Sequence, residues 1–453
     1  MTKIRLLAPN NRAHLFKQSA ILLSLTMLVS CSPLQTASPK KQIATPVAGL
    51  TAQQKSKFER CAKTFQHEFT AQEGLGPVYN AKSCASCHDS EQSNSNDLAA
   101  IENKNSLASR SLILFASRKD PKASKSLLKS SATLRDVHFY ENQGMGLVEK
   151  HSLSESIAAL KDCKVETIGI PKDCDFVSTR IARSLDGVGL INAIPDNQID
   201  KLEEQQLELD VDAVGRVLDR KDRLTFESRI NRFGQKCIES NLLMVAADMM
   251  NDAIGISSPS NPKVRAPGGE SKLPTCLSSF VASEPNDNGK IQAELTYYMS
   301  LLAAPERGKI TPAVKRGEQT FEKLGCAFCH VPELRSAEKV TVVDPDSKFP
   351  DLDFIEIEAL ENKPVAAYSD FLVHHMGNDL ADGIPEGRAS ASEWRTAPLW
   401  GIRKRKQYLH DGRAKSLSEA IMLHGGQAEQ AAASFNALCE TEKNELLEFL
   451  QSL

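Results

Sequence analysis

The sequence predicts a mainly α-helical protein made of two related units. Apolar residues recur at helical spacing along much of the chain, and stretches rich in proline and glycine separate the helical pieces. The motif Cys-x-x-Cys-His occurs twice, at residues 84–88 and 326–330. Because a similar helical segment precedes each copy, the motif marks an internal repeat.

The repeated motif is typical of covalent haem attachment. Two thiols two residues apart can bond to the two vinyl groups of one porphyrin, and the following histidine can bind the iron. A zinc site would need two further soft ligands near each pair, and a redox-active dithiol would need no histidine at this position. The sequence therefore predicts two covalently bound haem c groups. The expected cofactor-binding residues are Cys84, Cys87, His88, Cys326, Cys329 and His330, with His88 and His330 as iron ligands.

The repeat extends beyond the motif. Residues 60–65 (Arg-Cys-Ala-Lys-Thr-Phe) precede the first copy, and residues 316–321 (Arg-Gly-Glu-Gln-Thr-Phe) precede the second. Each unit also closes with an amphipathic helix. A leading helix, a haem loop and a closing helix are the parts of a small cytochrome c domain. The apolar faces of the closing helices are Ile291, Leu295, Tyr298, Leu301 and Leu302 in the first, and Leu446, Leu447, Leu450 and Leu453 in the second.

The fold class predicted is thus mainly α, with two cytochrome c-like haem domains. The N-terminal domain is expected at 51–306 and carries a large helical insertion, and the C-terminal domain is expected at 307–453. Helices are predicted over Asp210–Asp219 and Ile238–Ile254, and loops over 257–274 and 342–364. Met244, Met249 and Met250 lie in the second helix, where core packing is the favoured role over haem ligation.

The N-terminus predicts export. Residues 1–17 carry four basic residues and no acid, and the apolar run at 20–29 is too short to span a bilayer. This pattern is typical of a secretory signal. The run ends in Leu28-Val29-Ser30-Cys31, which looks like a bacterial lipobox, although ordinary cleavage with Cys31 uninvolved is the alternative. We therefore expect a signal peptide at 1–30, lipidation of Cys31, and a flexible tether at 31–50. The expected location is the periplasm, with a lipid anchor in a membrane and the outer membrane favoured.

Charge and cysteine content agree with this compartment. Removal of the four basic residues in 1–30 changes the formal net charge from −3 to −7, which excludes a nucleic-acid-binding surface as the expected function. Of the eleven cysteines, six lie outside the motifs and the lipobox. An even number in an exported chain permits three disulfides. The most local pair among them is Cys163 with Cys174.

Several blocks of the chain resemble a known family. The most specific is residues 393–401 (Glu-Trp-Arg-Thr-Ala-Pro-Leu-Trp-Gly), and the others are residues 75–88, 181–190, 231–236 and 408–413. These blocks resemble a bacterial di-haem oxidoreductase family, also labelled thiol oxidoreductase. That family is similar to di-haem cytochrome c peroxidases and to the maturase that builds tryptophan tryptophylquinone. The resemblance implies a redox protein that exchanges electrons with a partner protein.

The resemblance also implies a sixth ligand for the second iron, one helix beyond the turn at His410. His424 occupies that position. Ser416 or Ser418 can cap a short helix that ends at His424, and two glycines follow it. The alternative is a histidine favoured only by the helix dipole. Met376, preceded by His374 and His375, is the second choice for this iron, and His410 is expected to hydrogen-bond within its turn.

The first haem departs from the peroxidase pattern, because no histidine or methionine lies between Asp89 and Lys104. Its sixth position is expected to be open, weakly occupied, or bound by a distant residue such as Met145. An open iron suits peroxide reduction, which needs an acid or base nearby. The candidates are Glu141, Gln143, Glu149 and His151, and His67 and His138 are the other histidines near this haem in sequence.

Two classes of function follow. In the first, the chain is a di-haem c-type cytochrome oxidoreductase of the cell envelope. It passes electrons between a C-terminal bis-histidine haem and an N-terminal haem that reduces peroxide or another oxidant. The alternative is a non-enzymatic electron-transfer lipoprotein with both haems six-coordinate. A partner subunit of an iron-acquisition or respiratory complex is a third reading.

Overall fold

The structure is a computed structural model. It describes residues 44–88, 176–209, 213–221, 226–263, 285–347 and 349–453, and short pieces at 112–117, 146–147, 151–153, 157, 160, 162–163 and 275–278. The predicted signal peptide and Cys31 lie outside the described residues. The far end of the predicted tether is described, and there Val47 donates a backbone hydrogen bond to Leu301 O at 2.8 Å.

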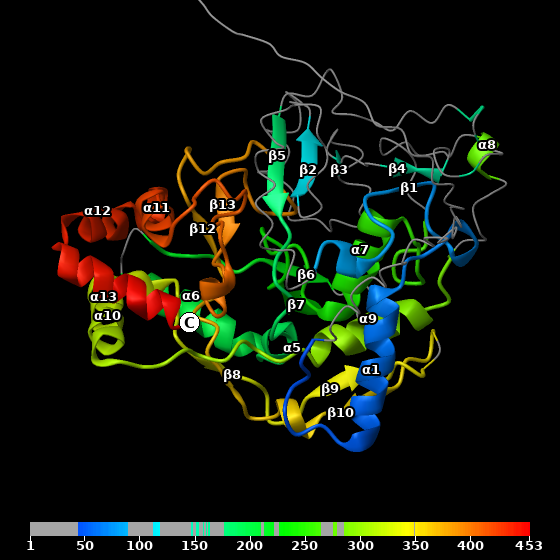
Figure 1. Cartoon of the computed structure of the whole chain (residues 1–453), viewed down its shortest axis with the longest axis horizontal. Coiled ribbons are helices and arrows are strands. Elements are labelled where there is room, and N and C mark those ends of the chain that lie inside the picture. The colour runs from blue at the N-terminus through cyan, green and yellow to red at the C-terminus, as the bar shows by residue number, and fades with distance from the viewer. Residues whose placement is uncertain are drawn as a thin grey trace, which may run out of the picture. The chain divides into compact units, whose positions relative to one another are not determined.

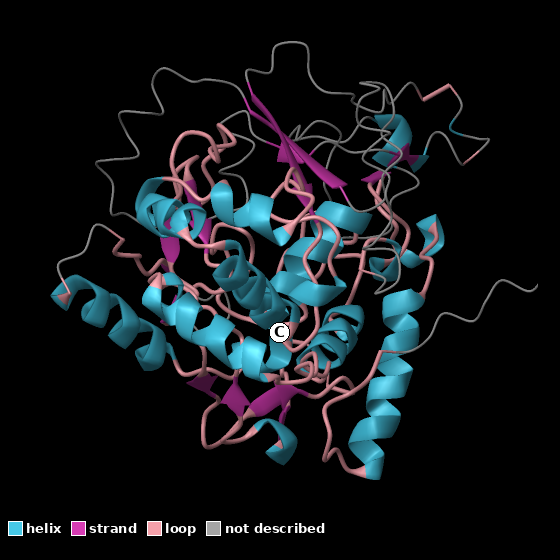
Figure 2. Cartoon of the chain, turned by 60° about the vertical axis from the view of Figure 1, so that its left-hand side comes forward, coloured by secondary structure: helices cyan, strands magenta, loops and turns pink. Residues whose placement is uncertain are grey.

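The described chain is rich in helix, which confirms the predicted class, and its strands are short (Figures 1 and 2). The α-helices are α1 (Ala52–Gln66), α5 (Val188–Asn192), α6 (Asp196–Glu208), α7 (Leu242–Ile254), α8 (Thr275–Ser278), α9 (Lys290–Ser300), α10 (Pro312–Lys323), α11 (Leu417–Met422), α12 (Glu429–Ala437) and α13 (Glu440–Gln451). No helix of the described part is long and apolar enough to cross a membrane.

The strands pair antiparallel in small sheets. One sheet has the order β3-β2-β5, and the others are the pairs β1-β4, β6-β7, β8-β11, β9-β10 and β12-β13. Their bounds are β1 (Val78–Tyr79), β2 (Leu112–Ser117), β3 (Gly146–Leu147), β4 (His151–Ser152), β5 (Phe176–Ile181), β6 (Asp219–Lys221), β7 (Ser228–Ile230), β8 (Leu334–Arg335), β9 (Thr341–Val343), β10 (Phe354–Glu356), β11 (Pro364–Val365), β12 (Val373–His375) and β13 (Glu393–Arg395).

Each leading helix packs against a closing helix, α1 against α9 and α10 against α13 (Figure 1). Helix α1 begins at a capping box, in which Thr51 and Gln54 exchange side-chain to backbone hydrogen bonds. Its buried residues, among them Phe58 and Phe65, follow helical spacing along one face. The sequence thus predicts both helices of this pair, because Leu295 and Tyr298, two residues of the predicted apolar face of α9, are also buried.

Helix α10 begins with a side-chain cap followed by a proline. Thr311 accepts a hydrogen bond from Val314 N, and Pro312 takes the first turn, where its missing N–H costs nothing. Gly317 sits where α10 crosses α13. A Cβ added there would lie 2.0 Å from Glu445 O, so only glycine allows this close approach.

The two predicted domains share one core. Residues of the predicted C-terminal domain pack in the same buried cluster as α1, α7 and α9. Salt bridges add to this contact, because Lys57 of α1 lies 2.6 Å from Asp344. The division into two cytochrome c-like domains stays a prediction. The shared-core residues from beyond 306 are Val340, Val342, Ile357, Leu360, Val365, Ala367, Phe371 and Leu372.

Three expectations within the predicted insertion and its loops need correction. The helix predicted over Asp210–Asp219 is wrong, because Arg216 forms a β-bridge with Val373 and Asp219 begins β6. Pairing with a distant strand overrides the local spacing here. The helix predicted from Ile238 begins only at Leu242, after the Asn241 cap. The loop predicted over 342–364 contains most of the β9-β10 hairpin and ends at the first residue of the short strand β11. In addition, the region predicted as helical carries the β3-β2-β5 sheet.

The cysteines pair differently from the most local expectation. Cys163 forms a disulfide with Cys276, at a sequence separation of 113 residues. Cys174 lies outside the described residues. Among those described, Cys61 and Cys237 are buried free thiols and Cys439 is an exposed one. A pairing across so long a segment depends on the tertiary fold and has no local sequence signal.

Candidate functional site

The two Cys-x-x-Cys-His motifs have matching surroundings. Each begins as one turn of 3-10 helix, Cys84–Ser86 and Cys326–Phe328. A phenylalanine of the leading helix lies beside each motif histidine. The ring centroids of Phe65 and His88 are 6.4 Å apart, and those of Phe321 and His330 are 6.3 Å apart. The repeat seen in the sequence is therefore also a repeat in geometry.

Both motif histidines are held in one tautomer. Nδ1 of His88 lies 3.0 Å from Arg183 O, and Nδ1 of His330 lies 3.0 Å from Tyr368 O. A carbonyl oxygen can only accept, so Nδ1 donates its hydrogen in each case. The other nitrogen, Nε2, then carries a lone pair that is available to a metal.

His424 has the same arrangement. It follows α11, whose first turn is capped by Ser416, one of the two predicted caps. Its Nδ1 donates to Ala420 O at 2.7 Å, so Nε2 is again the free nitrogen. His424 and His330 line the same cavity. The structure thus brings together the two histidines predicted for the second iron.

The electrostatics keep these imidazoles neutral, as a metal ligand must be. Burial, followed by the neighbouring His424, lowers the pKa of His330 to about 4. Burial also lowers the pKa of His88 and of His424, against the opposing effect of their carbonyl partners. Each can bind iron at neutral pH without first losing a proton.

The competing residues are arranged differently. His374 uses both ring nitrogens, with Nε2 2.9 Å from Asp370 Oδ2 and Nδ1 3.6 Å from Cys329 Sγ. His375 is exposed, and Met376 lines the cavity. His410 stacks on Trp394 at 3.8 Å between ring centroids, with the rings 13° from parallel. Met376 and His410 both line the cavity, and Nε2 of His410 lies 3.8 Å from Asp411 Oδ2.

The residues predicted near the first haem are described only in part. His67 is exposed and lies 2.8 Å from Glu73, so it pairs at the surface. The backbone of His151 pairs with Tyr79 in the β1-β4 ladder. Of the methionine cluster, Met244 and Met250 are buried, as the favoured interpretation predicts, whereas Met249 is 38% exposed. Met249 and Met250 also line the cavity described next. His138, Glu141, Gln143, Met145 and Glu149 lie outside the described residues.

One cavity of about 1430 Å³ contains both motifs and His424. Pockets for a single drug-sized ligand measure roughly 300–1,000 Å³, so this space suits something larger. The walls are mostly apolar, which fits the faces of a porphyrin. Apolar side chains of both units form them, including Leu242, Ala246, Met250, Leu295 and Met299 from the first and Leu417, Ile421, Leu446 and Leu450 from the second. The residues present therefore fit two haems.

Sequence reasoning assigned no role to the cations of this cavity. Arg183, Arg395 and Arg405 all line it. Arg183 and Arg395 belong to blocks that carry the family resemblance, but a single arginine gives no sign of where its side chain points. The same holds for Trp394, which has Lys236 Nζ 3.9 Å from its ring centroid. Only the fold brings these groups to one place.

The family match supports two haems in this chain. Residues 159–453, more than half of the chain, match the family described as "Di-haem oxidoreductase, putative peroxidase". No curated protein matches the chain. Among solved structures, the chain is similar to the di-haem peroxidase BthA from Burkholderia thailandensis, at 12% identity and a TM-score of 0.36, over 92% of this chain and 88% of that one.

A variant of that peroxidase has a TM-score of 0.37 at 12% identity, again over 92% of this chain and 88% of that one. Hydrazine synthase from Kuenenia stuttgartiensis is 22% identical with a TM-score of 0.24, and the match covers 39% of this chain and 59% of that chain. These TM-scores are too low to establish a shared fold. The assignment rests on the family match, and by that match this chain belongs to the di-haem oxidoreductase family.

Proposed function

We propose that this chain is a di-haem c-type cytochrome oxidoreductase of the cell envelope. His330 and His424 would hold a C-terminal haem and His88 an N-terminal haem, and the chain would pass electrons between the two groups to peroxide or another oxidant. Each haem belongs to a cytochrome c-like unit, formed around α1 and α9 in one case and α10 and α13 in the other. Membership of the di-haem oxidoreductase family supports haem binding, electron transfer and oxidoreductase chemistry.

The observation that carries the proposal is the common arrangement of three histidines in one cavity. His88, His330 and His424 each donate Nδ1–H to a backbone carbonyl. This fixes the ring orientation and leaves Nε2 for iron. Two of the three come from the repeated motif, and the third lies beside His330. His330 and His424 would hold one haem, and His88 would hold the other.

A haem supplies reversible one-electron transfer at its iron and, where an axial position is open, a place for an oxidant to bind. The chain's own residues do the rest. The motif cysteines fix the position of each group, and the carbonyls of Arg183 and Tyr368 hold the proximal rings. The apolar walls exclude water, which strengthens every charge interaction inside the cavity. Reduction of a peroxide to water takes two electrons, which matches two one-electron sites in one chain.

Electron paramagnetic resonance of the oxidised protein tests whether the two haems differ in their iron ligands as proposed. We expect one low-spin ferric signal from the haem with two imidazoles and one high-spin signal from the haem with an open position. The reduced protein should then be reoxidised by hydrogen peroxide. Two low-spin signals, with no reoxidation by peroxide, would instead support the electron-transfer lipoprotein without an enzymatic role.

The proposed location depends on Cys31. We propose that its lipidation anchors the protein to the outer membrane from the periplasmic side, where a redox partner protein exchanges electrons with it. We expect the protein to partition into detergent and to sediment with membranes. Cys31→Ala should block processing or release a soluble periplasmic form. Cys439→Ala, which removes an exposed thiol far along the chain, is the matched control. An identical fractionation of Cys31→Ala and the control would end the lipoprotein proposal.

A further inference from the structure

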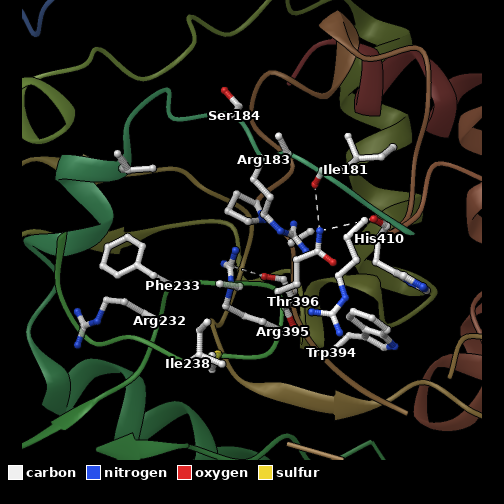
Figure 3. A pocket seen from close by; sticks show the side chains of 18 of the residues that line it. Ile181, Arg183, Ser184, Arg232, Phe233, Ile238, Trp394, Arg395, Thr396 and His410 are labelled. Atoms are coloured by element: carbon white, nitrogen blue, oxygen red, sulfur yellow. Dashed lines mark hydrogen bonds between the residues drawn. The ribbon is translucent and has the colours of Figure 1, made fainter. Parts of the chain in front are cut away.

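Three arginines from separate segments line the haem cavity. Arg183 follows β5, Arg395 ends β13, and Arg405 follows the short 3-10 helix Ile402–Lys404. Figure 3 shows Arg183 and Arg395 next to Thr396 in the interior of the cavity. One arginine thus comes from the predicted N-terminal domain and two from the predicted C-terminal domain.

These arginines have no carboxylate to neutralise them. Arg183 Nε is buried without a hydrogen-bond partner among the described residues. Within the described part of the chain, Arg395 donates to the neutral oxygens Gly234 O at 2.9 Å and Thr396 O at 3.3 Å. Within the described ranges, neither Arg183, Arg395 nor Arg405 lies within ion-pair distance of an acid.

Two other arginines of the same cavity show the usual arrangement. Arg180 lies 2.6 Å from Asp382 and 2.6 Å from Glu386. Arg232 pairs with Asp196. A buried charge is tolerated when it is paired in this way, and it is costly when it is not. The burial of Arg180 and Arg232 is explained by their acidic partners, whereas the burial of Arg183, Arg395 and Arg405 is not.

The three cations also repel one another. Burial, then Arg395 and Arg405, lowers the pKa of Arg183 well below its usual range. Burial lowers the pKa of Arg395, against weaker attraction from Cys237 and Asp370. Burial likewise lowers the pKa of Arg405, against attraction from Asp186 and Tyr408. Asp370 is already committed, since it accepts from Gln206 at 2.9 Å and pairs with His374. This part of the cavity therefore holds three guanidinium groups that no carboxylate of the described residues neutralises.

We propose that Arg183, Arg395 and Arg405 form a binding site for the carboxylates of a haem held in this cavity. The inference rests on the proposed haem binding and adds to it which residues hold the acidic edge of the porphyrin. Guanidinium groups bind carboxylates with two parallel hydrogen bonds, so three of them can hold both propionates of one haem. Because the arginines come from both predicted domains, the same contact joins the two halves of the protein.

Arg183 is the central residue of this site. Its carbonyl oxygen accepts the hydrogen of His88 Nδ1 at 3.0 Å, while its side chain joins the arginines of the other half. The carboxylates can come from the first haem, next to His88, or from the second haem, next to His330. Both sources offer the same chemistry to the arginines, and the redox measurement below separates them.

The test is a spectroelectrochemical titration of the two haems in the full-length protein. A cation near a haem favours the ferrous state, so Arg183→Gln should lower the midpoint potential of one haem. We expect a change of about tenfold in its reduction equilibrium, or ~59 mV for a one-electron couple. Arg183→Lys keeps the charge and should recover most of the shift. Arg405→Gln should lower the midpoint potential of the same haem. This second variant replaces Arg183→Gln in the test if the Arg183→Gln protein does not accumulate in cells.

Lys404→Gln is the matched control, because it removes one charge from a side chain that is 59% exposed and adjacent to Arg405. A shift confined to the low-spin haem assigns the carboxylates to the second haem, and a shift confined to the other haem assigns them to the first. Potentials equal to those of Lys404→Gln in both arginine variants would overturn the site. Haem content, measured as the pyridine haemochrome of the unmodified protein, reports separately on the proposed haem binding.

Discussion

His424→Gly should convert the C-terminal haem from a low-spin to a high-spin ferric state. The substitution removes the imidazole whose Nδ1 is fixed to Ala420 O and whose Nε2 is the free donor in the cavity beside His330. One axial ligand leaves the iron in a weaker field, which favours the high-spin state. The measurement is the electron paramagnetic resonance and visible spectrum of the oxidised variant, compared with those of the unmodified protein.

His424→Met separates ligand loss from ligand exchange. A thioether stabilises ferric iron less than an imidazole does, so this variant should stay low-spin but have a higher reduction potential. It should also gain a near-infrared sulfur charge-transfer band. His410→Ala is the control, because His410 stacks on Trp394 and is expected to act within its own turn, so the spectrum of this variant should change less. A sulfur band already present and retained in His424→Gly would move the assignment to Met376. A spectrum indifferent to His424→Gly would refute the ligand assignment altogether.

The sequence was most informative where a local signal sets the structure. The cap at Ser416 and the apolar faces of the closing helices depend on residues a few positions apart. The haem motif is equally local, because both thiols and the histidine lie within five residues. Such signals survive without any knowledge of the tertiary fold.

The sequence was least informative where distant segments meet. The helix expected over Asp210–Asp219 gives way to pairing between Arg216 and Val373. Backbone hydrogen bonds such as Arg395 N to Gln235 O tie the two predicted domains together, and no periodicity encodes such a contact. The group formed by Arg183, Arg395 and Arg405 is hidden for the same reason. What sets this group apart is that none of its members forms an ion pair with an acid among the described residues, and the sequence alone does not show this.

Loss of one motif should remove one haem and spare the other. In Cys84→Ser/Cys87→Ser, neither thioether of the first haem can form, while the second motif keeps its own leading helix α10 and its own histidine, His330. We expect the pyridine haemochrome to fall from two haems per chain to one. The denatured variant should keep haem colour on a gel, because the second group remains covalently attached. Cys326→Ser/Cys329→Ser should give the reciprocal result.

The same variant should also lose stability, because the haems fill a shared cavity of about 1430 Å³. Unfilled space in a core costs roughly 24 cal/mol per Å³, so ~100 Å³ left empty costs ~2 kcal/mol. Cys237→Ser is the control for a buried thiol outside the motifs. It should keep both haems, with only the smaller cost of a buried hydroxyl. Thermal unfolding followed at a haem band and by circular dichroism measures both effects.

Two outcomes would contradict the covalent assignment in different ways. If acid acetone strips all haem from the unmodified protein, the motif cysteines do not bind haem covalently. If either double variant loses both haems, the two sites do not load independently. That second result would mean that the two units fold together. They share the core around Val342 and Phe371, so a first unit that misfolds without its haem would also disrupt the haem cavity of the second. If each double variant keeps one haem, each motif binds its own haem and the common core still folds when one haem is absent.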